Sequence, residues 1–455
     1  MKSTKPVDHI SNLELEYVDP AALVPDPRNA RLHPKAQSAR LIAAIQNFGF
    51  TNPILIDETN SVIAGHARRD AAVEIGLSQV PCIRLAHLTK SQKQALAIAD
   101  NRLAELATWD AELLGQHLSE LCDIEFDVEL TGFDTAEIDV MFAASETPAT
   151  DDPEDEVPPI DPKVPAVTHL GDRWQLDRHT LLCANAIEAA SYLALLGEER
   201  AELIFTDPPY GVPIAGHVSG LGKVKHREFV MGGKMSSDDF KAFLASAMSN
   251  MAEFSKDGSI HYVCMDWRHL PEVLDAGAQA YTQLKNICVW DKVSAGMGSL
   301  YRSQHEMILV FKNGNAPHQN NVNLGRQGRY RTNVWKYQGL SGFSKGRDEQ
   351  LAIHPTCKNL ALVADAIRDC SKRNDLVLDP FAGSGTTILA AERTGRRAAA
   401  MELDPLYVDA TIQRWLKTPG RTATLVGDGR SFVDIAVARA ASASDPANGQ
   451  DADHG

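Results

Sequence analysis

Several features that mark other classes of protein are missing from this 455-residue sequence. Its seven cysteines are odd in number and form no CxxC pair, which argues against a disulfide framework and a zinc site. No run approaches the roughly 18 apolar residues of a membrane-spanning helix, and the first residues lack the apolar core of a signal peptide. We therefore expect a cytoplasmic protein with reduced thiols, no bound metal and no membrane contact.

An excess of positive charge is also missing, since the formal net charge is −15. This balance argues against a protein that coats nucleic acid nonspecifically, but it allows a local basic surface. The hydrophobic content of 44% and the charged content of 23% are ordinary for a globular protein. The length allows about three domain-sized units, and we find no internal repeat.

An acidic, proline-rich segment divides the chain. Residues 144–166, ASETPATDDPEDEVPPIDPKVPA, have few large apolar groups and cannot bury enough surface to offset their ordering entropy, which predicts an extended linker. The small, polar tail at 440–455 is predicted to be disordered. The remaining units are a smaller α/β domain with trailing helices at 12–143 and a larger domain at 167–435. In the larger one, apolar runs alternate with helical segments, which predicts a doubly wound α/β sheet with helices on both faces.

The stretch TDPPYG, which follows the apolar run AELIF, predicts a site. An apolar strand that ends in Pro and Gly is typical of the carboxyl edge of a parallel sheet, so Asp207 is expected to face a crevice. Pro208 and Pro209 fix the backbone and lack N–H donors, which leaves a rigid loop of acceptors beside the ring of Tyr210. A proline-stiffened turn with a capping aspartate is the alternative.

A second pattern, DLVLDPFAGSGTTILAAERTGRRAAAMELDP, predicts a strand, a glycine turn, a helix and another strand. Gly383 and Gly385 let a ligand approach the turn, the helix N-terminus supplies N–H groups, and Glu402 can accept from both hydroxyls of a ribose. ATP is disfavoured because Thr386, and not a lysine, follows the turn. NAD stays open but usually needs GxGxxG. S-adenosylmethionine has no phosphates and fits best; a packing role for the glycines is the alternative.

Together TDPPYG, DPFAGSGTT and AMELDPLY resemble the adenine-type amino DNA methyltransferases whose catalytic loop precedes the cofactor loop. The resemblance covers about residues 168–427. It implies a Rossmann-like methyltransferase fold, S-adenosyl-L-methionine as cofactor and double-stranded DNA as substrate. It also implies that HPTCK helps to hold the methionyl end of the cofactor and that LLCANA contacts its adenine, with Asn where Asp is usual. The implied site residues are, for catalysis, Asp207, Pro208, Pro209 and Tyr210 and, for the cofactor, Asn185, His354, Thr356, Lys358, Asp379, Phe381, Gly383, Gly385 and Glu402.

The catalytic loop suits methylation of an exocyclic amine. Such an amine is a poor nucleophile because its lone pair is delocalised into the ring. If the Asp207 carboxylate and the Pro208 carbonyl each accept one N–H, the lone pair is directed at the methyl group. The base must leave the duplex to be reached, and Tyr210 is its natural stacking partner. Within the resemblance, Asp at the head of the motif favours the N6 amine of adenine, and the N4 amine of cytosine is the alternative.

A basic and aromatic stretch at 325–347, GRQGRYRTNVWKYQGLSGFSKGR, is expected to contact DNA phosphates. Weaker candidates for the same surface lie at 220–229 and 300–306, and a solvated loop is the alternative. The expected DNA-binding residues are Arg302, Arg326, Arg329, Arg331 and Lys336.

NARLHP, VIAGHARRDAA and IADNRL resemble a ParB-type nuclease or partition domain over residues 12–105. In that family a GxxRR turn holds a nucleotide triphosphate, and Gly65, Arg68 and Arg69 match it, so CTP is the implied ligand. His66 stands where the family often has Glu, which leaves a DNA-contacting or regulatory module as the alternative, and solvated arginines as another.

We therefore predict a site-specific DNA adenine-N6 methyltransferase of the restriction-modification kind, with an added ParB-like domain; a homodimer is compatible with it. Three other functions stay open. They are a cytosine-N4 methyltransferase, a partition or regulatory protein with an inactive methyltransferase half, and an RNA or protein methyltransferase.

Overall fold

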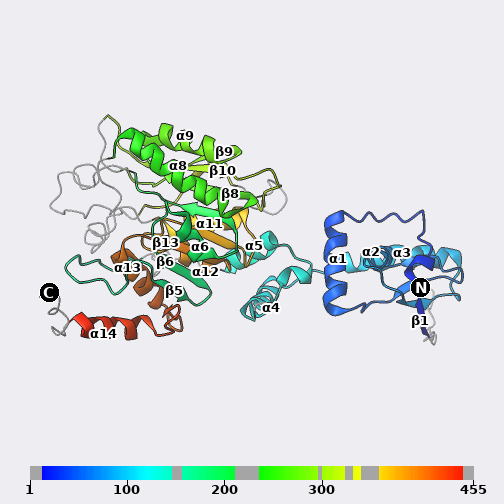
Figure 1. The fold of residues 1–455 in the computed structure, drawn as a ribbon. Coiled ribbons are helices and arrows are strands. Elements are labelled where there is room, and N and C mark those ends of the chain that lie inside the picture. Colours follow the sequence, from blue (N-terminus) through cyan, green and yellow to red (C-terminus); the bar gives the residue numbers. More distant parts are fainter. Residues whose placement is uncertain are drawn as a thin grey trace, which may run out of the picture. The chain divides into compact units, whose positions relative to one another are not determined.

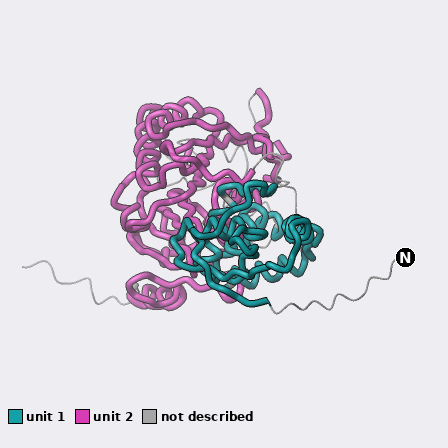
Figure 2. Tube along the Cα trace, turned by 90° about the vertical axis from the view of Figure 1, so that its right-hand side faces the viewer, with its two compact units in different colours: residues 1–145 teal, residues 146–455 magenta. Residues whose placement is uncertain are grey.

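The chain forms two compact units, Met1–Ser145 and Glu146–Gly455 (Figure 2). The computed structural model describes residues 13–124, 126–145, 156–210, 235–295, 300–322, 331–339 and 358–443. Within these ranges no helix combines the length and the apolar character that crossing a membrane requires.

The first unit is a small α/β domain followed by two helices (Figure 1). Its sheet has the order β1-β4-β2-β3, in which only the β2 and β4 pair is parallel. The bounds of its helices, strands and short 3-10 helices are β1 Leu15–Val18, η1 Pro20–Ala22, α1 Lys35–Phe48, β2 Ile54–Ile56, β3 Val62–Ala64, α2 His66–Glu74, β4 Val80–Arg84, α3 Lys90–Glu105, α4 Ala111–Asp123, η2 Val128–Thr131 and α5 Thr135–Ser145.

The two helices that trail the small domain have a core of their own. Leu118 on α4 and Ile138 on α5 are buried together with Val128 on η2, apart from the cluster of Ile54, Ile56 and their neighbours in the small sheet. A pair of helices with its own apolar cluster is therefore added to the α/β domain.

The second unit is built on a large sheet in the order β11-β9-β10-β8-β7-β12-β13-β6-β5-β14. The central strands β8, β7, β12, β13 and β6 are parallel, and β10, β9, β5 and β14 each join a neighbour in the antiparallel sense. The strand bounds are β5 Arg173–Leu176, β6 His179–Cys183, β7 Ala201–Thr206, β8 Ser255–Met265, β9 Gln283–Asp291, β10 His305–Lys312, β11 Val334–Lys336, β12 Leu376–Asp379, β13 Arg397–Glu402 and β14 Thr424–Leu425.

Helices cover both faces of this sheet, as the sequence predicts. Helices α6, α8 and α9 share one apolar cluster, and α11, α12, α13 and α14 share the other. Figure 1 shows α8 and α9 packed against each other. The bounds are α6 Ala189–Leu196, α8 Ser237–Glu253, η4 Trp267–His269, α9 Leu270–Ala280, α11 Leu360–Cys370, α12 Thr386–Arg393, α13 Pro405–Leu416 and α14 Phe432–Ala443.

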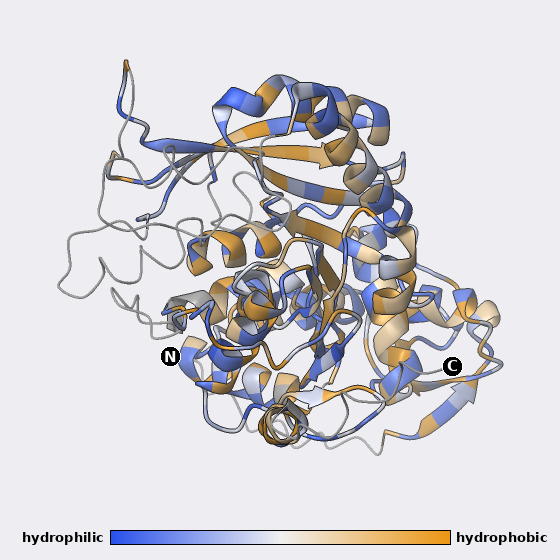
Figure 3. Cartoon of the chain, turned by 60° about the vertical axis from the view of Figure 1, so that its left-hand side comes forward, coloured by the Kyte–Doolittle hydropathy of each residue, from blue (hydrophilic) through white to orange (hydrophobic). Residues whose placement is uncertain are grey.

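The alternation of side chains along a strand explains why both faces of the sheet are apolar. On β7, Leu203 and Phe205 point to the cluster of α11 and α12, whereas Ile204 between them points to the cluster of α6 and α8. Successive side chains of a strand leave opposite faces of the sheet, so a central strand covered on both sides must be apolar throughout. Figure 3 shows the resulting hydrophobic strands between the helices.

Two boundaries differ from the sequence-based expectation. Within the expected linker, Val157 is buried and the Glu156 carboxylate pairs with Lys417 of the second unit at 2.9 Å. Helix α14 continues to Ala443, past the expected domain end at 435 and into the expected tail. Its apolar residues Phe432 and Ile435 are buried, which ties the helix to the sheet despite the small residues that follow.

Candidate active site

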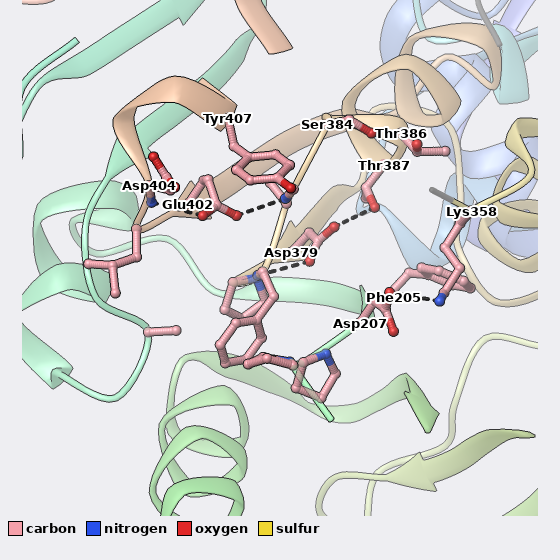
Figure 4. A pocket seen from close by; sticks show the side chains of 18 of the residues that line it. Phe205, Asp207, Lys358, Asp379, Ser384, Thr386, Thr387, Glu402, Asp404 and Tyr407 are labelled. Atoms are coloured by element: carbon pink, nitrogen blue, oxygen red, sulfur yellow. Dashed lines mark hydrogen bonds and ion pairs between the residues drawn. The ribbon is translucent and has the colours of Figure 1, made fainter. Parts of the chain in front are cut away.

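A pocket opens where β6, β7, β12 and β13 end. Parallel strands share one carboxyl edge, so their final residues meet there. Figure 4 shows Glu402 at one side of the pocket, Asp379 in the middle and Asp207 with Lys358 at the other side. Of the residues expected in the site, the pocket is lined by Asn185, Asp207, Pro208, Pro209, Tyr210, Lys358, Asp379, Phe381, Gly383 and Glu402.

The glycine turn between β12 and α12 has the conformation that glycine permits. Gly383 has φ +52° and Gly385 has φ +78°, both in the left-handed region. A Cβ on Gly385 would lie 2.4 Å from the Cγ2 atom of Thr411, so this glycine allows α13 to pack against the turn. A Cβ on Gly383 would meet no atom within 4 Å. Gly383 therefore borders open space, whereas Gly385 acts from behind the pocket.

Glu402 is held at the end of β13 by the backbone. Its Oε2 atom accepts the N–H of Gly383 and its Oε1 atom accepts the N–H of Asp404, each at 2.9 Å. Burial raises the pKa of Glu402 to about 7 in spite of these two bonds. Each oxygen retains acceptor capacity for a ligand hydroxyl, which is what a ribose-binding carboxylate needs.

Asp379 joins the three elements around the turn. Its carboxylate accepts from the Thr206 hydroxyl of β7 at 2.9 Å and from the Thr387 hydroxyl of α12 at 2.6 Å, and also from the N–H of Phe381. Burial raises its pKa to about 6. Asp379 thus anchors the loop from beneath while it lines the pocket.

Asn185 follows β6 and turns the chain toward α6. Its side-chain oxygen accepts the N–H of Ile187 at 3.2 Å, and its amide nitrogen donates to Glu188 at 3.2 Å. Asn185 therefore lines the pocket with a side chain whose orientation is set by its own turn.

Asp207 lies in a buried cluster of charged groups. Its Oδ1 atom accepts from the Tyr210 hydroxyl at 2.8 Å, and its Oδ2 atom lies 2.7 Å from the Lys358 ammonium. Glu306 at the start of β10 completes the cluster, because its Oε1 atom lies 2.5 Å from Lys358 Nζ and 2.6 Å from the Tyr210 hydroxyl, whose single hydrogen can go to either carboxylate. Lys292, just after β9, binds the other Glu306 oxygen at 2.8 Å.

Glu306 and Lys292 were not among the residues predicted to line the site. Both reach it because β10 runs antiparallel to β8 and β9, so the start of β10 and the end of β9 lie at the carboxyl edge of the parallel strands. The only signal in the sequence was a charged pair, His and Glu, directly before the apolar run MILVF. Glu306 stands at one end of this apolar run, as Asp207 does at the end of AELIF, and a polar residue in such a position is expected at an edge of the sheet.

The two carboxylates of the cluster have pKa values that are shifted in opposite directions. The two lysines hold the pKa of Glu306 well below its usual range despite burial. Burial and the nearby Glu306 carboxylate raise the pKa of Asp207, although Lys358 opposes this shift. The pKa of Lys358 is raised by the two carboxylates. Glu306 therefore stays ionised, and Asp207 is the carboxylate that takes up a proton more readily.

The chain is similar in sequence to known DNA-modifying proteins. Residues 201–413 match the family model described as DNA methylase, residues 4–102 match the ParB N-terminal domain, and residues 112–170 match the ParB-methyltransferase HTH domain. The chain therefore contains a DNA methylase domain of the N6/N4 family and an N-terminal ParB domain.

Individual relatives cover part of the chain. The ParB-like nuclease domain-containing protein YnaK of Escherichia coli (strain K12) is 45% identical over 82 residues, which are 18% of this chain and 94% of that protein. The type II methyltransferase M.HpaI of Haemophilus parainfluenzae is 26% identical over 250 residues, 51% of this chain and 73% of that protein. The solved structure of the PvuII DNA methyltransferase (cytosine-N4-specific) is 16% identical in sequence to this chain and matches it with a TM-score of 0.43. The match covers 59% of this chain and 95% of the PvuII chain.

The third match concerns helices that were predicted only as trailing helices of the small domain. The residues 112–170 that match the HTH model include most of α4 and all of η2 and α5, and they continue through the segment expected to be a linker. Along the chain, a helical module therefore lies between the ParB domain and the DNA methylase domain.

The cofactor of a DNA methylase is S-adenosylmethionine, and the pocket residues fit it. Glu402 offers two oxygens to a ribose, Gly383 leaves open space beside them, and Phe381 and Tyr407 supply apolar and aromatic lining. Lys358, which was expected at the methionyl end, lines the pocket and pairs with Asp207 and Glu306. His354 and Thr356 lie outside the described residues.

The cluster also includes three groups that a metal could use. One ligand atom each of Asp207, Cys264 and Glu306 lies within 4.8 Å of the others. The ammonium of Lys358 binds both carboxylates, so a cation from the protein already neutralises them. Burial raises the pKa of Cys264 well above its usual value, which keeps the thiol protonated. These groups therefore form an ion-pair cluster.

Arg331 does not face solvent as expected for a DNA contact. Its guanidinium binds Asp369 at 2.9 Å and Asp365 at 3.0 Å, and it lies over the ring of Trp335. Only 17% of the side chain is exposed. Without DNA, Arg331 ties the segment before β11 to α11, because two carboxylates of that helix attract it.

The other expected DNA contacts divide between exposed and undescribed positions. Arg302 and Lys336 are exposed, and Arg302 also donates to the carbonyl of Ala295. Arg326 and Arg329 lie outside the described residues, as does the weaker candidate segment at 220–229.

In the ParB domain the matched turn has the expected backbone. Gly65 has φ +101° and directly precedes α2. Arg68 donates to the carbonyl of Pro53 at 3.3 Å, and Arg69 donates to the carbonyl of Pro20 at 3.1 Å. Both guanidinium groups therefore pack on the domain's own backbone, in the first turn of the helix.

Proposed function

We propose that this DNA methylase transfers a methyl group from S-adenosylmethionine to the N6 amine of adenine in double-stranded DNA. One observation supports the proposal above the others. The rigid acceptor loop from Asp207 to Tyr210 and the ribose-type carboxylate Glu402 line the same pocket, from two strands that are not neighbours in the sequence. Target and cofactor groups would therefore meet within one site.

The chain's own residues prepare the amine. When bound, S-adenosylmethionine supplies a methyl group activated by its sulfonium. Asp207 and the carbonyl of Pro208 each accept one N–H of the target, which localises the nitrogen lone pair and orients it. Holding the reacting atoms about 3 Å apart and aligned supplies the proximity part of the rate gain. The proton released afterwards passes to water or to Asp207, whose raised pKa suits it to accept one.

The choice of adenine rests on the residue at the head of the loop. Asp207 provides a carboxylate acceptor where the cytosine-N4 relatives of the resembled family more often carry Ser. The N4 amine of cytosine is the second candidate, because it presents two N–H groups to the same acceptors.

The DNA surface is proposed to include the exposed cations near the pocket edge. Arg302 lies just before β10 and Lys336 ends β11, two strands that both flank β9 at one end of the sheet. Tyr301 beside Arg302 is 83% exposed. Cations at these positions can contact phosphates, and the exposed ring can contact a base.

Nucleoside mass spectrometry of duplex DNA methylated in vitro tests the target. We expect N6-methyladenine from the wild type and none from Asp207→Asn, whose cofactor affinity should stay within about threefold because Glu402 and the glycine turn are untouched. The matched control is Glu199→Gln, an exposed acid paired with Arg397. N4-methylcytosine without N6-methyladenine would refute the adenine assignment, and full turnover by the Asp207 variant would refute the role of the loop.

For the N-terminal unit we propose that the first turn of α2 binds a phosphate of a nucleotide or of DNA. Arg68 and Arg69 follow Gly65 at the start of this helix, where backbone N–H groups and cations favour an anion. Each guanidinium donates one N–H to a backbone carbonyl, and Arg69 also donates one to Asp70, which leaves further N–H groups for a phosphate. Titration of the full chain with CTP, other nucleotides and duplex DNA, compared with Arg69→Ala, tests this proposal.

A further inference from the structure

The carboxylate that is proposed to accept the target amine has no oxygen without a partner. Tyr210 donates to Asp207 Oδ1 at 2.8 Å and Lys358 binds Oδ2 at 2.7 Å. Each Asp207 oxygen keeps a second lone pair, so an N–H from the target would share the carboxylate with these two donors, and turning Asp207 toward the target weakens at least one of the two contacts. The following inference rests on the proposed function and concerns how Asp207 becomes available.

Both groups that occupy Asp207 also contact a second carboxylate. The hydroxyl of Tyr210 lies 2.6 Å from Glu306 Oε1, and Lys358 Nζ lies 2.5 Å from the same atom. Either group can therefore leave Asp207 and still keep an ionised partner. This matters because a buried ammonium without a counter-ion is strongly unfavourable.

Glu306 is fixed in the position that this exchange requires. It lies on β10 opposite Trp290 of β9 and is buried. Its second oxygen, Oε2, binds Lys292 at 2.8 Å, so only Oε1 turns toward Lys358 and Tyr210. With two lysines and two carboxylates the formal charges of the cluster balance, and no further ion is needed while the partners exchange.

We propose that Glu306 is a positioning residue that retains Lys358 and the Tyr210 hydroxyl when Asp207 turns to the target amine. Glu306 does not touch the target. It lowers the free-energy cost of freeing Asp207, because Lys358, which Asp207 and Glu306 share, keeps the Glu306 carboxylate as its partner. Lys292 assists by holding Glu306 ionised and oriented.

The test compares Glu306→Gln with Glu306→Asp in the full-length protein. Glutamine keeps the shape but loses the charge, and hydrogen bonds to charged acceptors are roughly twice as strong as neutral ones. Lys358 then prefers Asp207, which stays occupied. Asp369→Asn is the matched control, since it also removes a buried carboxylate from an ion pair, but outside the pocket.

Three measurements separate a positioning role from a merely structural one. We measure cofactor affinity by calorimetry and the single-turnover rate of methyl transfer. Without cofactor, we measure the fluorescence of a base analogue at the methylation site, which is located beforehand by sequencing DNA that the wild type has modified. For Glu306→Gln we expect cofactor affinity within twofold of the wild type, a reduced fluorescence change and a transfer rate at least tenfold lower. Glu306→Asp, which restores the charge, should lose clearly less of the rate and of the signal.

The outcomes distinguish this inference from the proposed function. A wild-type protein that methylates no DNA refutes the proposed function, and the role of Glu306 falls with it. Transfer by the wild type with an unchanged rate and signal in Glu306→Gln refutes the role of Glu306 alone. Equal losses in Glu306→Gln and Glu306→Asp, or equal losses in Asp369→Asn, also overturn it, since they show a general effect on the fold.

Discussion

Substituting Glu402 by Gln should weaken cofactor binding and remove its pH dependence. Both carboxylate oxygens accept a backbone N–H, from Gly383 and Asp404, and Glu402 lines the pocket. Glutamine can accept only one of these N–H groups and turns a donor toward the other. Each hydrogen bond from a ribose hydroxyl to the charged acceptor contributes about 1.5 to 3 kcal/mol, so losing one raises the dissociation constant by roughly 10- to 150-fold.

The pH dependence follows from the pKa of Glu402, which burial raises to about 7. If the cofactor binds the ionised form, the fraction competent to bind rises from about one tenth at pH 6 to about nine tenths at pH 8, a roughly tenfold gain in affinity. Stability without cofactor changes in the opposite direction. The folded protein holds this proton at a pH where the unfolded chain has lost it, so stability falls as the pH rises from the ordinary value of 4.5 to about 7.

Calorimetric titration of S-adenosylmethionine at pH 6 and pH 8 measures the effect. Other groups that titrate in this range, including those of the cofactor, contribute equally to the wild type and to Glu402→Gln, so the difference between the two isolates Glu402. Glu199→Gln serves as a control, because this acid pairs with Arg397 away from the pocket. An identical pH dependence in the wild type and in Glu402→Gln would refute the reasoning.

Three further predictions concern packing, DNA contact and the first unit. Gly385→Ala should destabilise the fold by about 1 to 3 kcal/mol, because its Cβ would lie 2.4 Å from Thr411 Cγ2 at a positive φ; denaturant unfolding measures this. Arg331→Met should destabilise the fold by about 3 kcal/mol, because two carboxylates lose their cation. Lys336→Ala should leave the stability of the fold unchanged and reduce the salt dependence of DNA binding by about one phosphate contact. The reverse pattern would show that Arg331 is the DNA contact. Limited proteolysis should release the compact unit Met1–Ser145 intact, and its digestion at the same rate as an unfolded chain would contradict its independence.

The sequence was sufficient where a local pattern and its neighbours in the chain define the chemistry. Asp207 at a strand end, the glycine turn and Glu402 at the end of the next strand all lie in segments whose geometry depends on a few adjacent residues. The α/β order of both units was predicted for the same reason, since the alternation of apolar strands and helices is a local signal. The structure confirms these elements.

Only the tertiary structure decided which charges share the site. Glu306 is 96 residues away from Tyr210 in the chain, yet the two are in contact because an antiparallel strand begins where the parallel strands end. In the same way Arg331 looked like a free cation in a basic stretch, but α11 presents two carboxylates to it. The sequence by itself determined the loops that can bind a target amine and a cofactor. The pairing of buried charges around those loops depends on strand direction and helix packing across the whole sheet, which no local pattern encodes.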